Sequence, residues 1–109
     1  MGVRTVASKN GIKIRLTAER WFHITESHDY MAGNQDMVLE TLENPDYIVK
    51  GDKYEMIALK HYAKTCITEK HLIVVYKEEA VNGFVITAFM TSKQEKILQR
   101  GVLWKKQSA

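Results

Sequence analysis

The sequence is poor in the residues that staple or interrupt a small fold. Of its 109 residues, one is cysteine and one is proline. A single cysteine, Cys66, cannot form an intrachain disulfide, and a lone thiol beside an apolar run suits a reducing compartment. No uninterrupted apolar stretch has the length of a signal peptide core or a membrane span. We therefore expect a cytoplasmic protein with no membrane partner.

The motifs of common metal and cofactor sites are also missing. One cysteine and four dispersed histidines supply neither a CxxC nor an HExxH pair. His23 and His28 are five residues apart, which on a helix separates their side chains by about 140° and makes them poor ligands of one ion. The sequence has no GxGxxG, GxxxxGK[ST] or GxSxG motif. We expect no metal and no cofactor, and none of the chemistry that these motifs support.

Neither sign of charge is in large excess, because the net charge is only +3. Residues 1–18 carry basic and no acidic side chains, residues 19–55 are mostly acidic, and residues 56–109 are mostly basic. If the two basic ends meet in the fold, they form one positive face that can hold a phosphate backbone. The alternative is an ordinary solvated surface. The balanced composition and the length predict one globular domain over 1–109.

Apolar periodicity predicts a strand and two helices in the N-terminal half. Apolar residues alternate with basic ones over 12–16, which is typical of a half-buried strand. Thr17 is the expected N-cap of a helix that runs to about residue 28. A second helix is expected over 34–42, and the turn that contains Pro45 ends it.

The C-terminal half is rich in β-branched and aromatic residues and predicts strands. The expected strands are 47–49, 54–65, 71–76, 84–90 and an edge strand at 102–104. The run 71–76 is apolar on both faces, so we place it in the middle of the sheet, in a hairpin with 84–90. Both faces of 54–65 are partly apolar, and the pattern leaves its inward face open. With a short helix from about 92 to 101, the pattern is that of an α+β domain with an antiparallel sheet.

The chain does contain an acid–base set that needs no metal. It consists of four histidines with tyrosine, lysine and arginine nearby: His23, His28, His61 and His71. In RNA cleavage a base removes the proton of the 2'-hydroxyl, a cation stabilises the phosphorane, and an acid protonates the leaving 5'-oxygen. Such a set therefore suits metal-independent cleavage of RNA.

Several segments resemble one known nuclease group. They are the run Ile14–Ile24, then His28, then Thr41–Asp46, and finally Gly83–Phe89. Together they are similar to the phage- and plasmid-borne branch of the barnase, EndoU, colicin and RelE-like group (the BECR fold), over about residues 12–92. The resemblance implies N-terminal helices packed on an antiparallel sheet of about four strands. It also implies a ribonuclease without a metal, of the kind used as a toxin.

The resemblance also points to particular site residues. It implies His23 as the acid or base, Arg20 as the phosphate clamp, and Thr87 as a hydrogen-bond donor to the phosphate. Thr91 is a weaker extension of this set in substrate binding. His28 is a second catalytic candidate, although aspartate follows it here where branch members often have proline.

Three further cations complete the candidate substrate-binding set: Arg15, Lys60 and Arg100. Each candidate also has a plain structural interpretation. His23 can pack beside Trp21, and Arg20 can form a surface ion pair, which contributes little to stability. Thr87 is a favourable strand residue in its own right. Trp104 is expected to pack at a sheet edge rather than to stack on a base.

Three functions fit these observations. The first is a metal-independent endoribonuclease, the toxin of a bacterial or phage conflict system, which cleaves RNA by 2'-hydroxyl transesterification. The second is a non-catalytic module of the same fold that binds RNA or a protein. The third is a subunit whose sheet edge pairs with an antitoxin, an immunity protein or a second copy of the chain, which would make a homo-oligomer.

Overall fold

The computed structural model describes residues 2–65 and 70–107, so Cys66 lies outside the described residues. Within these ranges the helices are α1 (Ala18–Ser27), α2 (Gln35–Glu43) and α3 (Gln94–Leu98), with a short 3-10 turn at Asp29–Met31. The strands are β1 (Val3–Ala7), β2 (Lys13–Thr17), β3 (Tyr47–Lys50), β4 (Glu55–Tyr62), β5 (Lys70–Glu78), β6 (Asn82–Thr91) and β7 (Val102–Lys105). The predicted α+β class is confirmed.

The boundary between β2 and α1 follows the local sequence. The Thr17 hydroxyl accepts a hydrogen bond from the backbone N–H of Arg20 at 3.0 Å, which makes Thr17 the N-cap of α1 as predicted. The helix ends at His28, whose backbone N–H donates to the carbonyl of Ile24. The second helix begins differently, because the Asn34 side chain donates to the Tyr30 carbonyl and makes no cap hydrogen bond to α2.

The sheet is larger than predicted and is mixed. Its strand order in the described residues is β1-β2-β6-β5-β4-β3-β7, seven strands where the resemblance implied about four and the sequence pattern predicted six. All neighbours are antiparallel except β2 and β6, which are parallel. The predicted β5–β6 hairpin and the central place of β5 are both confirmed. We did not predict β1, because most of its residues are exposed and it lacks the apolar alternation of a half-buried strand.

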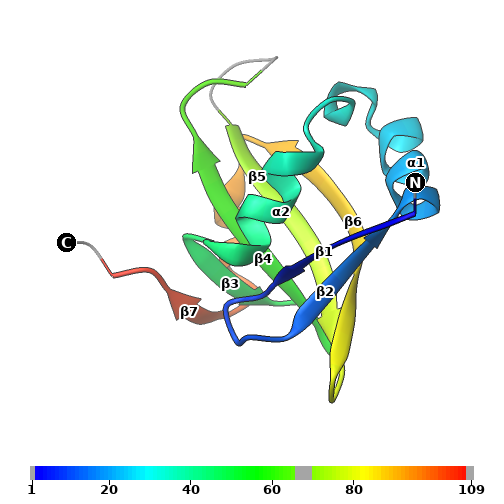
Figure 1. The fold of residues 1–109 in the computed structure, drawn as a ribbon. Coiled ribbons are helices and arrows are strands. Elements are labelled where there is room, and N and C mark those ends of the chain that lie inside the picture. Colours follow the sequence, from blue (N-terminus) through cyan, green and yellow to red (C-terminus); the bar gives the residue numbers. More distant parts are fainter. Residues whose placement is uncertain (1, 66–69, 108–109) are drawn as a thin grey trace.

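Different helices pack on the two faces of the sheet. Helices α1 and α2 pack on one face and bury the larger core, which includes Ile14, Ile24, Val38, Leu72 and Val74 (Figure 1). On the other face, Ile97 and Leu98 of the short helix α3 pack against Val49, Ile57, Leu59 and Ile73. Because α3 spans only five residues, this second core is smaller and is formed mainly by β3, β4 and β5.

The two basic ends of the chain meet, although β1 and β7 are the opposite edge strands of the sheet. Lys9, in the turn between β1 and β2, places its ammonium 4.8 Å from the ring centroid of Trp104 in β7. The two basic ends, whose meeting the charge pattern left open, therefore come together at the side of the sheet where β7 lies.

None of the described helices is both long and apolar enough to cross a membrane.

Candidate functional site

A cleft of about 530 Å³ opens where β4 ends and β5 begins. Its lining combines two histidines, two lysines, an aspartate, a tyrosine and a glutamine: His61, His71, Lys105, Lys106, Asp46, Tyr47 and Gln107. These residues come from β3, β4, β5 and the C-terminal segment that includes β7. The cleft therefore depends on long-range strand pairing rather than on one local motif.

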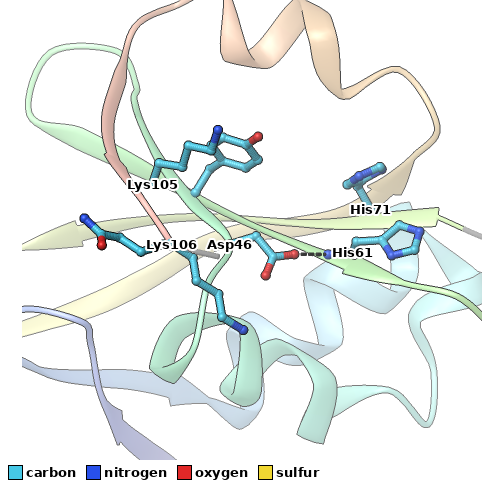
Figure 2. Close-up of a pocket in the computed structure, with 7 residues that line it drawn as sticks. Asp46, His61, His71, Lys105 and Lys106 are labelled. Atoms are coloured by element: carbon cyan, nitrogen blue, oxygen red, sulfur yellow. Dashed lines mark hydrogen bonds between the residues drawn. The ribbon is translucent and has the colours of Figure 1, made fainter. Parts of the chain in front are cut away.

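The two histidines of the cleft form a cross-strand pair. His61 in β4 lies opposite His71 in the antiparallel register, and their ring centroids are 5.0 Å apart (Figure 2). Side chains opposite each other in such a ladder lie on the same face of the sheet. His61 is exposed and His71 is half-buried. Two imidazoles thus stand side by side at the rim of the face that carries α3.

Asp46 and the lysines join the start of β3 to the end of the chain. The Asp46 carboxylate accepts a hydrogen bond from the backbone N–H of His61 at 2.8 Å, and the Asp46 carbonyl accepts one from the N–H of Lys106 at 2.8 Å. Lys105 lies opposite Tyr47 in the β3–β7 ladder, with its ammonium 5.9 Å from the tyrosine ring centroid. Asp46 therefore positions both the histidine strand and the two lysines.

The arrangement provides acids, bases and cations in one place. An imidazole can accept or donate a proton near neutral pH, and a lysine ammonium can neutralise a phosphate oxygen. His71 also lines a second hollow of about 220 Å³, with Ser92, Gln94 and Glu95. Within the described ranges, no three His, Cys, Asp or Glu side chains gather as the ligands of a metal ion would.

Two of the predicted site residues lie on the exposed side of α1. The side chain of His23 is 54% exposed, with its Nδ1 3.8 Å from the carboxylate of Glu26 and its ring in edge contact with Phe22. Arg20 is also exposed. These contacts are all within α1, so the structure does not bring His23 to Thr87 in the sheet.

His28, at the C-terminal cap of α1, contacts the sheet. The His28 ring lies 5.8 Å from that of Phe89 in β6, and its Nδ1 lies 3.3 Å from the Tyr30 hydroxyl oxygen. In the β5–β6 ladder Thr91 lies directly opposite His71. Thr87 is four residues away from Thr91 in β6 and lies on the same face of the sheet. His28 therefore contacts β6, the strand that contains Thr87 and Thr91 and lies next to β5.

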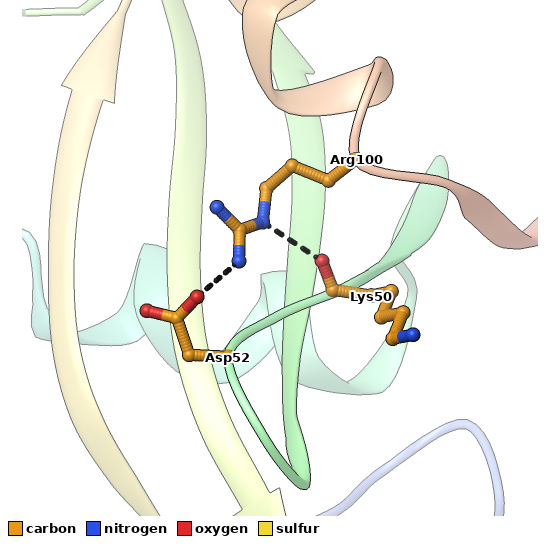
Figure 3. Close-up of polar contacts among 3 residues, drawn as sticks. All are labelled: Lys50, Asp52 and Arg100. Atoms are coloured by element: carbon orange, nitrogen blue, oxygen red, sulfur yellow. Dashed lines mark hydrogen bonds and ion pairs between the residues drawn. The ribbon is translucent and has the colours of Figure 1, made fainter.

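The three predicted cations have separate places. The Arg15 guanidinium lies 6.0 Å from the Phe84 ring centroid, at the far end of the face that carries the cleft. Lys60 points to the helix-covered face, where its ammonium donates to the Asn44 carbonyl at 3.1 Å. Arg100 pairs with Asp52 and donates to the Lys50 carbonyl (Figure 3). Lys60 and Arg100 therefore each hold a loop by a hydrogen bond to a backbone carbonyl.

His61 and His71 belong to the acid–base set expected from the sequence, but they were not among the predicted site residues. The predicted strands did not place them opposite each other, because 61 and 71 are equally far from the middle of the connection only with the observed ends of β4 and β5, Tyr62 and Lys70. Tyr47, Asp46 and the two C-terminal lysines carried no local signal either, since the order of β3, β4 and β7 in the sheet brings them together.

Comparison with protein families gives a match over nearly the whole chain. A family model described as "phage-Barnase-EndoU-ColicinE5/D-RelE like nuclease2" matches residues 2–105. No curated protein and no solved structure matches the chain. The matched range contains both histidines of the cleft, Asp46, Tyr47 and Lys105.

Proposed function

Because the chain belongs to the phage-Barnase-EndoU-ColicinE5/D-RelE like nuclease 2 family, we propose that it is a metal-independent endoribonuclease that uses His61 and His71 as its acid–base pair. Family membership, which confirms the resemblance found in the sequence, supports a nuclease. The choice of RNA and of this mechanism rests on one observation: the two imidazoles stand 5.0 Å apart in a cleft that also contains two lysines.

The reaction follows from the chemistry of RNA. One imidazole, in its neutral form, removes the proton of the ribose 2'-hydroxyl, and the oxygen attacks the adjacent phosphorus. The bond from phosphorus to the 5'-oxygen breaks, and the other imidazole, in its protonated form, gives that oxygen a proton. The products are a 2',3'-cyclic phosphate and a free 5'-hydroxyl. RNA supplies its own nucleophile, so two imidazoles perform both proton transfers.

The lysines supply positive charge to this reaction. Charge builds on the phosphoryl oxygens as the phosphorane forms, and a cation already in position stabilises it without reorganisation. Lys105 lies on the same sheet face as the histidines, because it pairs with Tyr47, which pairs with Leu59 of β4. The Asp46 carboxylate is engaged by the backbone N–H of His61, and we assign it a positioning role.

The test is cleavage of a single-stranded RNA by the purified chain in the presence of EDTA. We expect His61→Ala and His71→Ala each to lower the rate by about 10²- to 10⁴-fold, the usual contribution of one general acid or base. The product ends should be a cyclic phosphate and a 5'-hydroxyl. An oligonucleotide with a single ribose among deoxyriboses should be cut only after that ribose.

The matched controls are His23→Ala and Arg20→Ala, which change exposed side chains of α1. Both variants should cleave at close to the wild-type rate. If they are inactive while the His61 and His71 variants are active, the site is the one implied by the resemblance and this assignment is wrong. Intact RNA after long incubation with folded wild-type protein would remove the enzymatic proposal altogether and favour a binding module.

A toxin role extends the same proposal to the cell. We expect induction of the wild-type chain in bacteria to stop growth and degrade RNA, and the doubly substituted His61→Ala, His71→Ala chain to do neither at the same protein level. An antitoxin or immunity protein would then be found as the partner whose co-expression restores growth. Growth that continues under wild-type expression, with cleavage demonstrated in vitro, contradicts the toxin role alone.

A further inference from the structure

A third and smaller hollow adjoins the cleft on the side of β7. It has a volume of about 140 Å³ and is lined by Lys9, Glu43, Asn44, Pro45, Trp104 and Lys106. Lys106 lines both this hollow and the histidine cleft, so the two meet around the edge strand β7. Lys105 lies on the face of the histidines, and Trp104 lies on the face that carries α2. We refer to it as the Trp104 hollow.

The Trp104 hollow joins an aromatic ring to two cations. Trp104 is half-buried, so part of its indole remains accessible although it lies in an edge strand. The Lys9 ammonium lies 4.8 Å from the centroid of that ring, and Pro45 forms a buried wall. An aromatic ring beside lysines is the arrangement with which proteins hold single-stranded nucleic acid, because the base stacks on the ring and the cations meet the phosphates.

We propose that the Trp104 hollow binds a base of single-stranded RNA next to the scissile phosphate, which rests on the proposed ribonuclease function. The base stacks on the indole of Trp104 and displaces the Lys9 ammonium that otherwise lies over that ring. Lys9 and Lys106 then face the phosphates on either side of that nucleotide, and Lys106 leads the strand into the histidine cleft. Double-stranded RNA does not fit this role, because its bases are paired and stacked within the helix and cannot lie on an indole.

Binding of an RNA that cannot be cleaved tests this site directly. The probe is a fluorescently labelled single-stranded 2'-O-methyl oligonucleotide, whose blocked hydroxyl removes the nucleophile, and the measurement is its fluorescence anisotropy. We expect Trp104→Leu to weaken binding about tenfold or more, since stacking of one base accounts for that much. Trp104→Phe, which keeps a ring, should bind close to wild type.

Leu103→Ala is the matched control, because Leu103 is the neighbouring exposed residue of the same strand at 58% exposure. It should leave binding unchanged. A second measurement uses the chain's only other tryptophan: in a Trp21→Phe variant the remaining indole is Trp104, and its emission should be quenched when the oligonucleotide binds. Equal binding by Trp104→Leu and wild type, with no quenching, would overturn the proposal.

The two proposals fail in different ways. If RNA is cleaved but the Trp104 variants bind and cleave as wild type does, only the base-binding site is wrong. If the oligonucleotide binds in a Trp104-dependent way but natural RNA stays intact, the ribonuclease mechanism is wrong. A labelled duplex of the same sequence should bind less tightly than the single strand, and tighter duplex binding would contradict the stacking site.

Discussion

Two tyrosines of the helix-covered sheet face differ in what their hydroxyl groups contact. Tyr76 is completely buried in the core, and its hydroxyl has no hydrogen-bond partner among the described residues. Burial raises the pKa of Tyr76 above its ordinary range, with a smaller contribution from Glu78. Tyr62 is half-buried, and its hydroxyl donates to the Glu40 carboxylate. The pKa of Tyr62 is also raised, first by burial and then by Glu40.

Tyr62→Phe should therefore lower stability, whereas Tyr76→Phe should not. Tyr76→Phe removes a buried hydroxyl that gains nothing in the fold, so we expect the free energy of unfolding to stay the same or rise by up to about 1 kcal/mol. Tyr62→Phe leaves the Glu40 carboxylate without its hydrogen-bond donor and should lower the free energy of unfolding by about 1 kcal/mol. Urea denaturation at neutral pH measures both. A loss of stability in Tyr76→Phe would show that its hydroxyl has a partner.

At the scale of elements, Arg100 fastens the segment between α3 and β7 to the turn between β3 and β4. Its Nε donates to the Lys50 carbonyl at 3.0 Å, and its guanidinium pairs with Asp52 (Figure 3). The backbone N–H of Lys50 in turn donates to the Gly101 carbonyl at 2.9 Å. Because β7 pairs only with β3 in the described sheet, this contact holds the strand that carries Lys105 and Trp104.

Arg100→Ala should loosen β7 without unfolding the domain. The side chains of Arg100 and Asp52 are 41% and 79% exposed, so the pair contributes about 1 kcal/mol or less to global stability. We expect faster amide hydrogen exchange in β7 and unchanged exchange in β5. Asp52→Asn, which keeps the bond to the Lys50 carbonyl, should have a smaller effect. Unchanged exchange in β7 with a loss of RNA binding would instead support the sequence-based prediction that Arg100 binds substrate.

At the scale of the whole molecule, the net charge says little about RNA binding and the position of the charges says more. Lys105 and Lys106 line the cleft and Lys9 lines the Trp104 hollow, although they come from opposite ends of the chain. Arg20 lies on α1, which packs against β2 and β6, toward the edge of the sheet opposite β7. The RNA should therefore contact the lysines near β7 and not α1.

Salt dependence of binding tests this path. For the non-cleavable oligonucleotide, we expect Lys105→Ala and Lys106→Ala each to reduce the slope of log affinity against log salt concentration by about 0.7, the value for one phosphate contact on a single strand. Arg20→Ala should leave the slope unchanged. A reduced slope in Arg20→Ala would place the strand across α1.

Much of the local structure was predictable because it depends on neighbours in the sequence. The cap at Thr17, the end of α2 before Pro45 and the hairpin of β5 with β6 follow from residues within a few positions of each other. The parallel pairing of β2 with β6 joins residues about seventy positions apart, and no local pattern specifies it. Of the seven strands in the described residues only β1 was not predicted, and it pairs only at the edge of the sheet, whereas the smaller sheet of about four strands was what the resemblance implied.

The sequence by itself determined the α+β class, the absence of an intrachain disulfide, the nuclease family and the presence of four histidines that can exchange protons. Only the tertiary structure decided which histidines meet. A strand alternates its side chains between two faces, so shifting β4 by one residue would move His61 to the opposite face from His71. That register buries Ile57 and Leu59 on the face under α3 and Ala58 on the face under α1 and α2, so packing on both faces holds it. Packing across the sheet, rather than any local motif, therefore brings the two imidazoles and the C-terminal lysines together.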